Sequence, residues 1–301
     1  MNFHFNIAGR SKIWFAITAI SLVLCFASIA VNGFNLGIDF TGGTIIDLRF
    51  EKAVSVEDVR GVLKEFSLEN STIQLAGDIQ DSKSDSVVIR TYAIEDEQLR
   101  QNIMKALETQ IGKFELLRME KVGATVGSEL TRQAALALAV SWVLMIAYVS
   151  YRFELNFAMA AILCLIQDVV MVLGFFSFFR LELDSSFVAA LLTVVGYSIN
   201  GTIVIFDRIR ENLRSYRKSD GLVSLVNNAI NQTMTRSIYT VSTVLFATIS
   251  VYVFGGDTLK NFSLAMTVGF ISGTLTSIFL AGSLWLFFRN RRMKTVAVEA
   301  K

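Results

Sequence analysis

The chain lacks proline altogether and has one histidine and two cysteines in 301 residues. A single histidine cannot form a His-based metal cluster, and His4 precedes the first apolar run, so it cannot serve a Ser-His-Asp triad inside an apolar bundle. Cys25 and Cys164 lie inside apolar runs, where we expect packing residues with no disulfide or metal role. No glycine-rich loop ends in Gly-Lys-Ser/Thr, so no nucleotide site is predicted. We therefore expect no metal, cofactor or enzymatic activity, and an energy source in a gradient or a partner.

Charged residues are also scarce, at 18% of the chain against roughly 25% in an average soluble protein. Hydrophobic residues make up 53% of the chain, and the mean hydropathy is +0.52. The basic residues gather in short segments beside apolar runs, which is not the pattern of a nucleic-acid-binding protein. The composition predicts a protein that crosses a lipid bilayer several times.

Six apolar runs have the length of about 20 residues that a helix needs to cross a bilayer. They lie near residues 13–31, 132–150, 157–179, 185–206, 237–255 and 262–288. The first run is too long for the apolar region of a signal peptide, and no small-x-small cleavage site follows it cleanly. We interpret it as an uncleaved membrane helix, so the prediction is a polytopic α-helical membrane protein with six transmembrane helices.

Basic residues of the short loops predict the orientation of these helices. They fall before the first span, after the second, after the fourth and after the sixth: Arg10 and Lys12; Arg152; Arg208, Arg210, Arg214, Arg217, Lys218 and Arg236; and Arg289, Arg291, Arg292 and Lys294. With six spans all four groups lie on one side of the membrane. Both termini are therefore predicted to be cytoplasmic, and residues 35–130 to be extracytoplasmic.

Residues 35–130 hold 17 acidic and 11 basic side chains and are predicted to form a compact α+β domain. Alternating apolar residues predict strands at 44–50, 71–75, 86–92 and 114–122. Helical spacing predicts one helix behind Ser55 and Asp58, which can form a capping box, and another along residues 99–111. The order βαββαβ suggests a ferredoxin-like sandwich.

The expected domains follow from these elements. Residues 1–34 are the cytoplasmic N-terminus and the first transmembrane helix, and residues 35–130 are the extracytoplasmic ferredoxin-like domain. Residues 131–290 supply the other five transmembrane helices, and residues 291–301 are a cytoplasmic tail.

The fourth span carries a polar seam in its middle, made of Gly196, Tyr197, Ser198, Asn200, Gly201 and Thr202. Hydrocarbon offers hydroxyls and a carboxamide no hydrogen-bond partners, so these residues are expected to face another helix or a polar path. Two interpretations remain open: a seam that holds water for proton movement, or packing contacts between helices.

Two groups of charged residues complete the candidate site. Asp168 lies near the middle of the third span, where a carboxylate costs at least about 2.5 kcal/mol unless it is paired or hydrated. We interpret it as a proton carrier or counter-ion; the alternative is a hydrogen bond between helices made by its protonated form. Beyond the fourth span, Asp207, Arg208, Arg210 and Glu211 predict a cytoplasmic ion-pair cluster that also marks the topology.

Several motifs resemble the SecD/SecF family of protein-export membrane proteins, within the RND superfamily. They are Gly37-Ile38-Asp39-Phe40-Thr41-Gly42-Gly43-Thr44, Gly196-Tyr197-Ser198-Ile199-Asn200, Phe206-Asp207-Arg208-Ile209-Arg210-Glu211-Asn212, Asn231-Gln232-Thr233 with Arg236, and Phe254-Gly255-Gly256. The similarity extends from about residue 10 to about residue 290, in order and at the family's spacing.

The resemblance implies an RND-type half bundle in the bacterial inner membrane that pairs with SecD and associates with the SecYEG channel, with YajC and YidC as further partners. Such a subunit uses the proton-motive force to promote translocation of a preprotein. The resemblance also places Arg236 on the proton path, although a snorkelling membrane anchor is an equal alternative. Asp39, Gly42 and Gly43 form the family's signature turn, and glycine tolerates the positive φ of a turn into the α+β domain.

Three positions depart from the family pattern. Gly201 follows Ser-Ile-Asn, where the family usually has an aspartate implicated in proton passage. Gln167 precedes Asp168 where the family often has histidine, and Ala124 stands where it tends to have proline. Because glycine cannot exchange a proton, the usual relay cannot pass through position 201.

Other functions need different features. An intramembrane aspartyl protease requires two facing carboxylates, for which only Asp168 and Asp207 qualify, and no Gly-x-Gly-Asp sequence is present. A passive scaffold for SecD remains an alternative, as does a subunit of an RND-type small-molecule exporter. The exporter is disfavoured because the chain has only one six-span half.

Overall fold

A computed structural model describes residues 5–76, 83–216 and 221–299, and it divides the chain into two compact units. The membrane unit comprises Met1–Asn35 and Leu136–Lys301, and the α+β unit comprises Leu36–Ala135. The predicted roles of His4, Arg217 and Lys218 lie outside the described residues, as do the side chains of Arg292 and Lys294.

Six long apolar helices occur in the described part of the chain, one for each predicted span. They are α1 (Ser11–Asn32), preceded by the short helix η1 (Ala8–Arg10); α5 (Ala124–Arg152); α6 (Leu155–Phe178); α7 (Ser185–Arg214); α8 (Leu222–Phe254); and the last span, in which α9 (Asp257–Leu275) continues through η3 (Thr276–Ala281) into α10 (Gly282–Glu299). This architecture confirms the predicted polytopic helical fold. Two short strands, β1 (Asn35–Leu36) and β6 (Glu182–Leu183), lie at helix ends.

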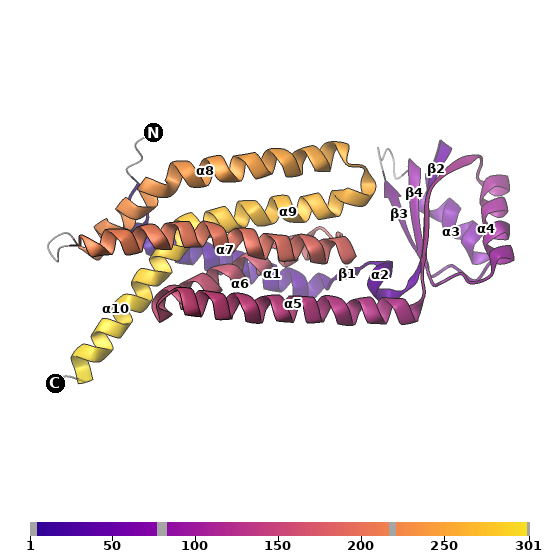
Figure 1. The fold of residues 1–301 in the computed structure, drawn as a ribbon. Coiled ribbons are helices and arrows are strands. Elements are labelled where there is room, and N and C mark those ends of the chain that lie inside the picture. Colours follow the sequence, from indigo (N-terminus) through magenta and orange to yellow (C-terminus); the bar gives the residue numbers. More distant parts are fainter. Residues whose placement is uncertain (1–4, 77–82, 217–220, 300–301) are drawn as a thin grey trace. The chain divides into compact units, whose positions relative to one another are not determined.

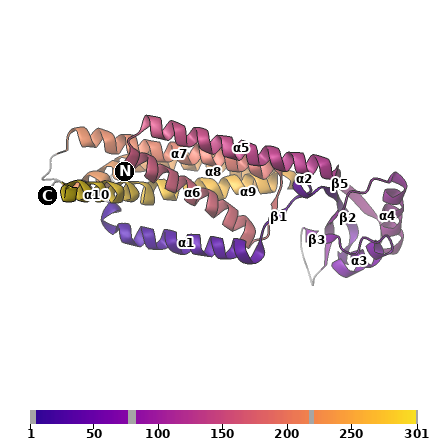
Figure 2. The same ribbon diagram turned by 90° about the horizontal axis from the view of Figure 1, so that it is seen from below.

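The membrane unit has an inner and an outer set of helices. In the apolar windows of α6 and of the last span, 50% and 56% of residues are buried, against 11% in α1 and in α8. Glycines allow the inner helices to approach closely, because a Cβ at Gly269 would lie 2.3 Å from a Val194 methyl and one at Gly273 would lie 3.0 Å from Ser198 Cβ. The inner helices α6, α7 and α9 therefore form the tightly packed centre that holds the polar residues described below (Figures 1 and 2).

The last span bends without proline. Its middle segment, η3, is π-helical, and Figure 1 shows α10 leaving at an angle to α9. Sharp bends in helices arise at prolines, at Gly/Ser pairs or at π-bulges, and here the π-helical segment is followed directly by Gly282-Ser283. The bend lies next to the residues that contact Asp168.

The α+β unit contains the elements predicted from alternation and helical spacing, together with the short helix α2 (Ile38–Thr41), which was not predicted. The predicted elements are β2 (Gly43–Ser55), α3 (Val56–Lys64), β3 (Thr72–Ala76), β4 (Lys83–Thr91), α4 (Glu97–Gln110) and β5 (Phe114–Val122). The strands form an antiparallel sheet in the order β3-β4-β2-β5, and α3 and α4 cover one of its faces (Figure 1). Leu48 and Ile89 of the sheet pack with Val59 and Leu107 of the helices in one buried core. This is the ferredoxin-like arrangement expected from the order of elements.

The glycine pair at the start of β2 forms a turn that other residues would not fit. Gly42 has φ +71° and Gly43 has φ +139°, a region that favours glycine. A Cβ on Gly43 would lie only 2.5 Å from the carbonyl oxygen of Thr91. The two glycines therefore let β2 begin directly beside β4.

Candidate functional site

Asp168 is completely buried and is surrounded by hydroxyl groups from the neighbouring helices. Ser272 Oγ of α9 donates to Asp168 Oδ1 at 2.7 Å, and Thr276 Oγ1 of η3 contacts the same oxygen. Ser198 of α7 contacts Oδ2. The carboxyl group of α6 therefore ties together α6, α7 and the last span, and we call these four residues the Asp168 cluster.

The Asp168 cluster can satisfy its hydrogen bonds whether or not Asp168 carries a proton. Thr276 Oγ1 contacts both Asp168 Oδ1 and the carbonyl oxygen of Ser272, but a hydroxyl has one hydrogen to donate. When Asp168 is ionised, Thr276 can donate to it. When Asp168 is protonated, it can donate to Thr276, which then donates to the Ser272 carbonyl. Proton exchange at Asp168 therefore needs only a change in the direction of existing hydrogen bonds.

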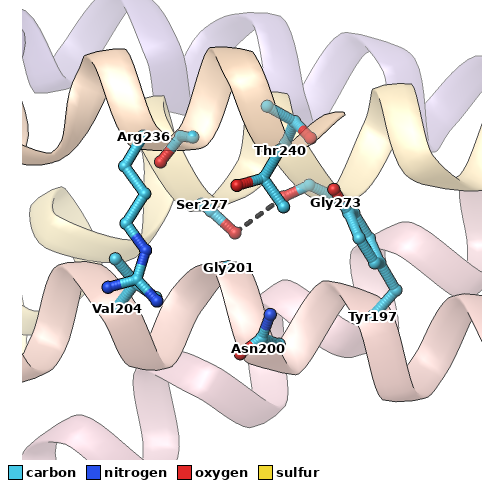
Figure 3. Close-up of a pocket in the computed structure, with 10 residues that line it drawn as sticks. Tyr197, Asn200, Gly201, Val204, Arg236, Thr240, Gly273 and Ser277 are labelled. Atoms are coloured by element: carbon cyan, nitrogen blue, oxygen red, sulfur yellow. Dashed lines mark hydrogen bonds between the residues drawn. The ribbon is translucent and has the colours of Figure 1, made fainter. Parts of the chain in front are cut away.

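A small cavity of about 50 Å³ lies nearby, between α7, α8 and α9. Its lining includes the predicted seam residues Tyr197, Asn200 and Gly201, together with Arg236 and Ser277. Figure 3 shows the Arg236 side chain extending from α8 towards α7, close to Val204 and Gly201. We call this space the Arg236 cavity. It has room for a water molecule, which needs at least about 10–15 Å³ of such volume.

Arg236 lies beside the position that departs from the family pattern. A Cβ at Gly201 would lie 3.0 Å from Ser277 Oγ, so position 201 faces the Arg236 cavity. Among the side chains that the structure describes, no carboxylate lies within ion-pair distance of Arg236. The guanidinium group is therefore available to a counter-ion from outside the chain, or to water.

Two hydroxyl groups and one packing contact lie between the Asp168 cluster and the Arg236 cavity. Thr202 Oγ1 lies 3.0 Å from Ser277 Oγ, and Ser277 Oγ donates to the Gly273 carbonyl at 2.7 Å (Figure 3). Gly273 in turn packs directly against Ser198 of the Asp168 cluster. The six predicted path residues thus fall into two neighbouring groups: Asp168 and Ser198 in one, Tyr197, Asn200 and Arg236 in the other, with Thr202 between them.

Three residues of the site, Ser272, Thr276 and Ser277, were not predicted. They all belong to the last span, where residues 272–277 read Ser-Gly-Thr-Leu-Thr-Ser inside an otherwise apolar run. This polar segment was the signal that could have identified them, in the same way that the seam of the fourth span did.

The four charged residues after the polar seam form ion pairs at the end of α7. Arg208 Nη1 lies 2.6 Å from Glu211 Oε2, and Asp207 lies 3.3 Å from Arg152 and 3.8 Å from Arg210. Arg152 is an additional partner that the sequence did not reveal. Asp207 is nine residues beyond Ser198, or about 13 Å along the helix, so the structure does not bring it to face Asp168. The arrangement gives no support to a two-carboxylate protease.

The two cysteines are both free in the structure. Cys164 is fully buried, and Cys25 packs against Gly174 in the contact between α1 and α6. Among the described residues, no three His, Cys, Asp or Glu side chains are grouped as a metal site would require.

Two family models match the chain. The model for the C-terminal part of the protein-export membrane proteins SecD and SecF matches residues 102–291, and that for the SecD/SecF GG motif matches residues 27–54. The protein translocase subunit SecF of Acidaminococcus fermentans is 54% identical over 95% of this chain and 98% of its own length. That of Pseudomonas aeruginosa is 40% identical over 98% of this chain and 95% of its own.

A solved structure has the same fold. The crystal structure of SecDF from Thermus thermophilus, described as a translocon-associated membrane protein, is 35% identical in sequence and superposes with a TM-score of 0.85. The similarity covers 96% of this chain but only 39% of SecDF, so the chain spans about two fifths of that protein. With six spans and bacterial relatives, it is a multi-pass bacterial membrane protein. The chain belongs to the SecD/SecF family of protein-export membrane proteins.

Proposed function

We propose that the chain is an auxiliary, non-enzymatic subunit of the Sec protein translocase, which acts with SecD beside SecYEG and uses the proton-motive force to promote preprotein translocation. Relatives that share nearly its whole length are translocase subunits named SecF, and the similar solved structure is a translocon-associated SecDF. YajC and YidC are further proposed partners in the same membrane.

The observation that carries the coupling role is the Asp168 cluster. A carboxyl group at the junction of three helices reverses the direction of its hydrogen bonds when it gains or loses a proton. We propose that the accompanying loss or gain of charge changes how closely those helices pack. The π-helical η3 adjoins the cluster and marks the place where the last span departs from regular α-helix. Proton movement can thereby be converted into movement of α6 and α7 relative to the last span.

Arg236 and the seam residues supply the second part of the proposed path. The guanidinium group lies in a cavity with Tyr197, Asn200 and Ser277, whose polar groups can hold water. Gly201 provides no carboxylate, and none of the described carboxylates pairs with Arg236. A carboxylate of the partner SecD or a bound anion would supply a counter-charge, and in the first case the partner completes the path.

The proposed orientation places both termini in the cytoplasm and the α+β unit outside. The basic ion-pair cluster of Arg208, Arg210 and Arg152 then lies on the cytoplasmic side, as the positive-inside rule requires. Movement of the membrane helices would swing the α+β unit, which prevents a translocating chain from sliding back.

Export assays in membrane vesicles test this function. Asp168→Asn keeps the shape of the side chain but removes its exchangeable proton, so gradient-stimulated export should fall to the rate seen without a gradient. Arg236→Leu should reduce the same component. Asp184→Asn is the matched control, because Asp184 caps α7 and asparagine caps a helix equally well. If both Asp168→Asn and Arg236→Leu respond fully to the gradient, the chain is instead a passive scaffold for SecD.

A further inference from the structure

An apolar groove lies between α1 and α6, towards the end of α1 from which the chain enters the α+β unit. It has a volume of about 490 Å³ and is lined by side chains from residues 21–32 of α1 and residues 171–179 of α6. Most of its lining is apolar, and Leu24, Val31 and Phe178 are exposed there. Figure 2 shows α1 at the edge of the bundle, beside α6. We call this space the α1–α6 groove.

The length of the groove corresponds to one leaflet of a bilayer. From residue 21 to residue 32 helix α1 rises about 16 Å, and one leaflet contributes about 15 Å to a hydrocarbon core of about 30 Å. Cys25 and Gly174 both line the groove, and they pack so closely that Gly174 has no room for a Cβ. This contact closes the groove on the side of the bundle. An acyl chain lying along the outside therefore fits the groove in length and in polarity.

The groove becomes polar where the two helices end. Ser28 Oγ donates to Ser177 Oγ at 3.3 Å, and Ser177 Oγ donates to the Gly33 carbonyl at 2.8 Å. Asn32, which lines the groove, donates from Nδ2 to Ser28 Oγ at 3.3 Å. A carboxamide nitrogen has two hydrogens, so Asn32 retains one for an oxygen of a ligand. The polar groups thus lie at the end where the headgroup of a lipid would be.

Arg180 has an unusual backbone conformation at this end of α6. The Leu181 amide donates to the Phe176 carbonyl at 2.9 Å, and the Arg180 amide donates to the Ser177 carbonyl at 3.2 Å. These two bonds form a Schellman motif, which ends a helix with one residue in the left-handed region. That residue is usually glycine, because it has no Cβ, but here it is Arg180 with φ +51°. A less favourable residue in this position suggests a task for its side chain.

The guanidinium group of Arg180 has no counter-ion in the described part of the chain. The side chain is exposed, and no described carboxylate forms an ion pair with it. Arg180 directly follows Phe179 of the groove, and Asn35 Nδ2 donates to its carbonyl at 3.0 Å, so it lies beside the end of α1. Long basic side chains at the ends of membrane helices reach the level of the lipid headgroups. An exposed cation therefore lies at the polar end of an apolar groove.

We propose that the α1–α6 groove binds an anionic phospholipid, with one acyl chain along the groove, its phosphate on Arg180 and an ester oxygen on Asn32. A guanidinium group binds phosphate through two parallel charge-assisted hydrogen bonds. The bound lipid packs α1, whose apolar window is only 11% buried, against α6. In the proposed orientation this lipid belongs to the outer leaflet. Its binding does not depend on the proposed role in export.

Photochemical cross-linking tests the site in membrane vesicles that contain the full chain and its proposed partner. The probe is phosphatidylglycerol with a diazirine near the end of one acyl chain, and the comparison is diacylglycerol with the same chains and no phosphate. We expect phosphatidylglycerol to label residues 21–25 of α1 and 171–175 of α6 about tenfold more strongly, because diacylglycerol lacks the charge-assisted hydrogen bonds. Equal labelling by the two lipids would overturn the proposal.

Two substitutions of Arg180 separate the role of its charge from that of its backbone. Arg180→Gly removes the guanidinium group but suits φ +51°, so labelling should fall about tenfold while the melting temperature in detergent without added lipid stays the same or rises. Arg180→Lys keeps the charge and should retain more labelling than Arg180→Gly. Arg132→Gln is the matched control, because it removes an exposed guanidinium group of α5 that does not line the groove. Labelling that survives Arg180→Gly, or a lower melting temperature of this variant, would contradict the assigned role of Arg180.

Filling the groove tests the position of the acyl chain. Ala27 lines the groove and is exposed, so Ala27→Trp should occupy the space and lower the labelling about tenfold. Ala30 is also an exposed alanine of α1 but does not line the groove, so Ala30→Trp should leave the labelling unchanged. If neither lipid labels the groove in the complex, a helix of the partner covers it and the proposal is wrong. That result would leave the proposed export function standing, since export is measured separately.

Discussion

At the scale of single residues, the site contains one position that carries a buried carboxyl group and one position that carries no side chain. Asp168 keeps a carboxyl group in the bundle by collecting hydroxyls from three segments, whereas position 201 has no side chain at all and leaves a cavity beside Arg236. The two positions are linked through Ser277, Thr202 and the packing of Gly273 against Ser198. We therefore expect a change at position 201 to alter the packing around the Asp168 cluster.

Gly201→Asp tests whether the missing carboxylate limits coupling. The new side chain would enter the Arg236 cavity, where it can pair with the guanidinium group after Ser277 shifts by a few tenths of an ångström. We expect gradient-dependent export to rise severalfold over that of Gly201→Ala, which adds the same Cβ without a charge. Equal export by the two variants would show that the proton path does not use position 201.

The Asp168 site was only half predictable from the sequence. Asp168 and Ser198 were identifiable because a polar atom within an apolar run is itself a signal. Ser272 and Thr276 give a weaker signal, because serines and threonines in a membrane helix commonly bond to their own backbone. Only the packing of three helices shows that these two hydroxyls turn towards the same carboxyl oxygen.

At the scale of elements, the predicted and observed bounds agree best where a single periodic pattern of apolar residues determines the element. Strand β5 has the predicted bounds, and Ser55 and Asp58 form the predicted capping box at the start of α3. Helix α8 differs, since it begins at Leu222 rather than near residue 237. Its early part is polar, and Asn227 and Asn231 hydrogen-bond the N-terminal segment at Ala8 and Phe5. Sequence patterns cannot show such a contact between distant segments.

The capping box gives α3 a pH-dependent contribution to stability. Hydrogen bonds from the hydroxyl and the amide of Ser55 hold the pKa of the Asp58 carboxyl group below its usual value. Their stabilisation is present above the pKa of an unfolded aspartate, about 3.9, and is lost as the pH falls through the lower pKa of the folded state. We expect Ser55→Ala to destabilise α3 by about 0.5–2 kcal/mol at neutral pH and to weaken its pH dependence below pH 4.

Hydrogen exchange of the α3 amides in the full chain, corrected for the intrinsic rate at each pH, measures this effect. The amides of α4, whose N-cap is Asp96, provide an internal control. If the protection of α3 falls by the same amount between pH 7 and pH 3 in the unchanged chain and in Ser55→Ala, the assignment to Asp58 is wrong.

At the scale of the whole molecule, the number of spans determines on which side each segment lies. Six helices long enough to cross a membrane put the first and last residues of the bundle on the same side, and the basic loops predict that this side is the cytoplasm. The fold class could be predicted because apolar length and period-two alternation are properties of the sequence. The helix contacts could not, since they depend on which face each span turns inward.

Thiol labelling of intact cells checks the orientation. In a background without Cys25 and Cys164, Glu57→Cys in the α+β unit should react with a membrane-impermeant maleimide. Ser215→Cys at the end of α7 should react only after the membrane is opened. Both residues are exposed, so accessibility to solvent does not itself separate them. The reverse pattern would invert the topology and reject the proposed direction of export.

The peripheral position of α8 has a consequence for how long an unassembled copy of the chain persists in the cell. This helix is only 11% buried in its apolar window, and its exposed Arg236 has no carboxylate partner among the described side chains. An unassembled copy would leave this guanidinium group without the counter-charge that the proposed partner supplies, which favours extraction and degradation by membrane quality control. We therefore expect the amount of this chain to follow the supply of the proposed partner SecD, so that unequal synthesis of the two subunits is corrected after translation.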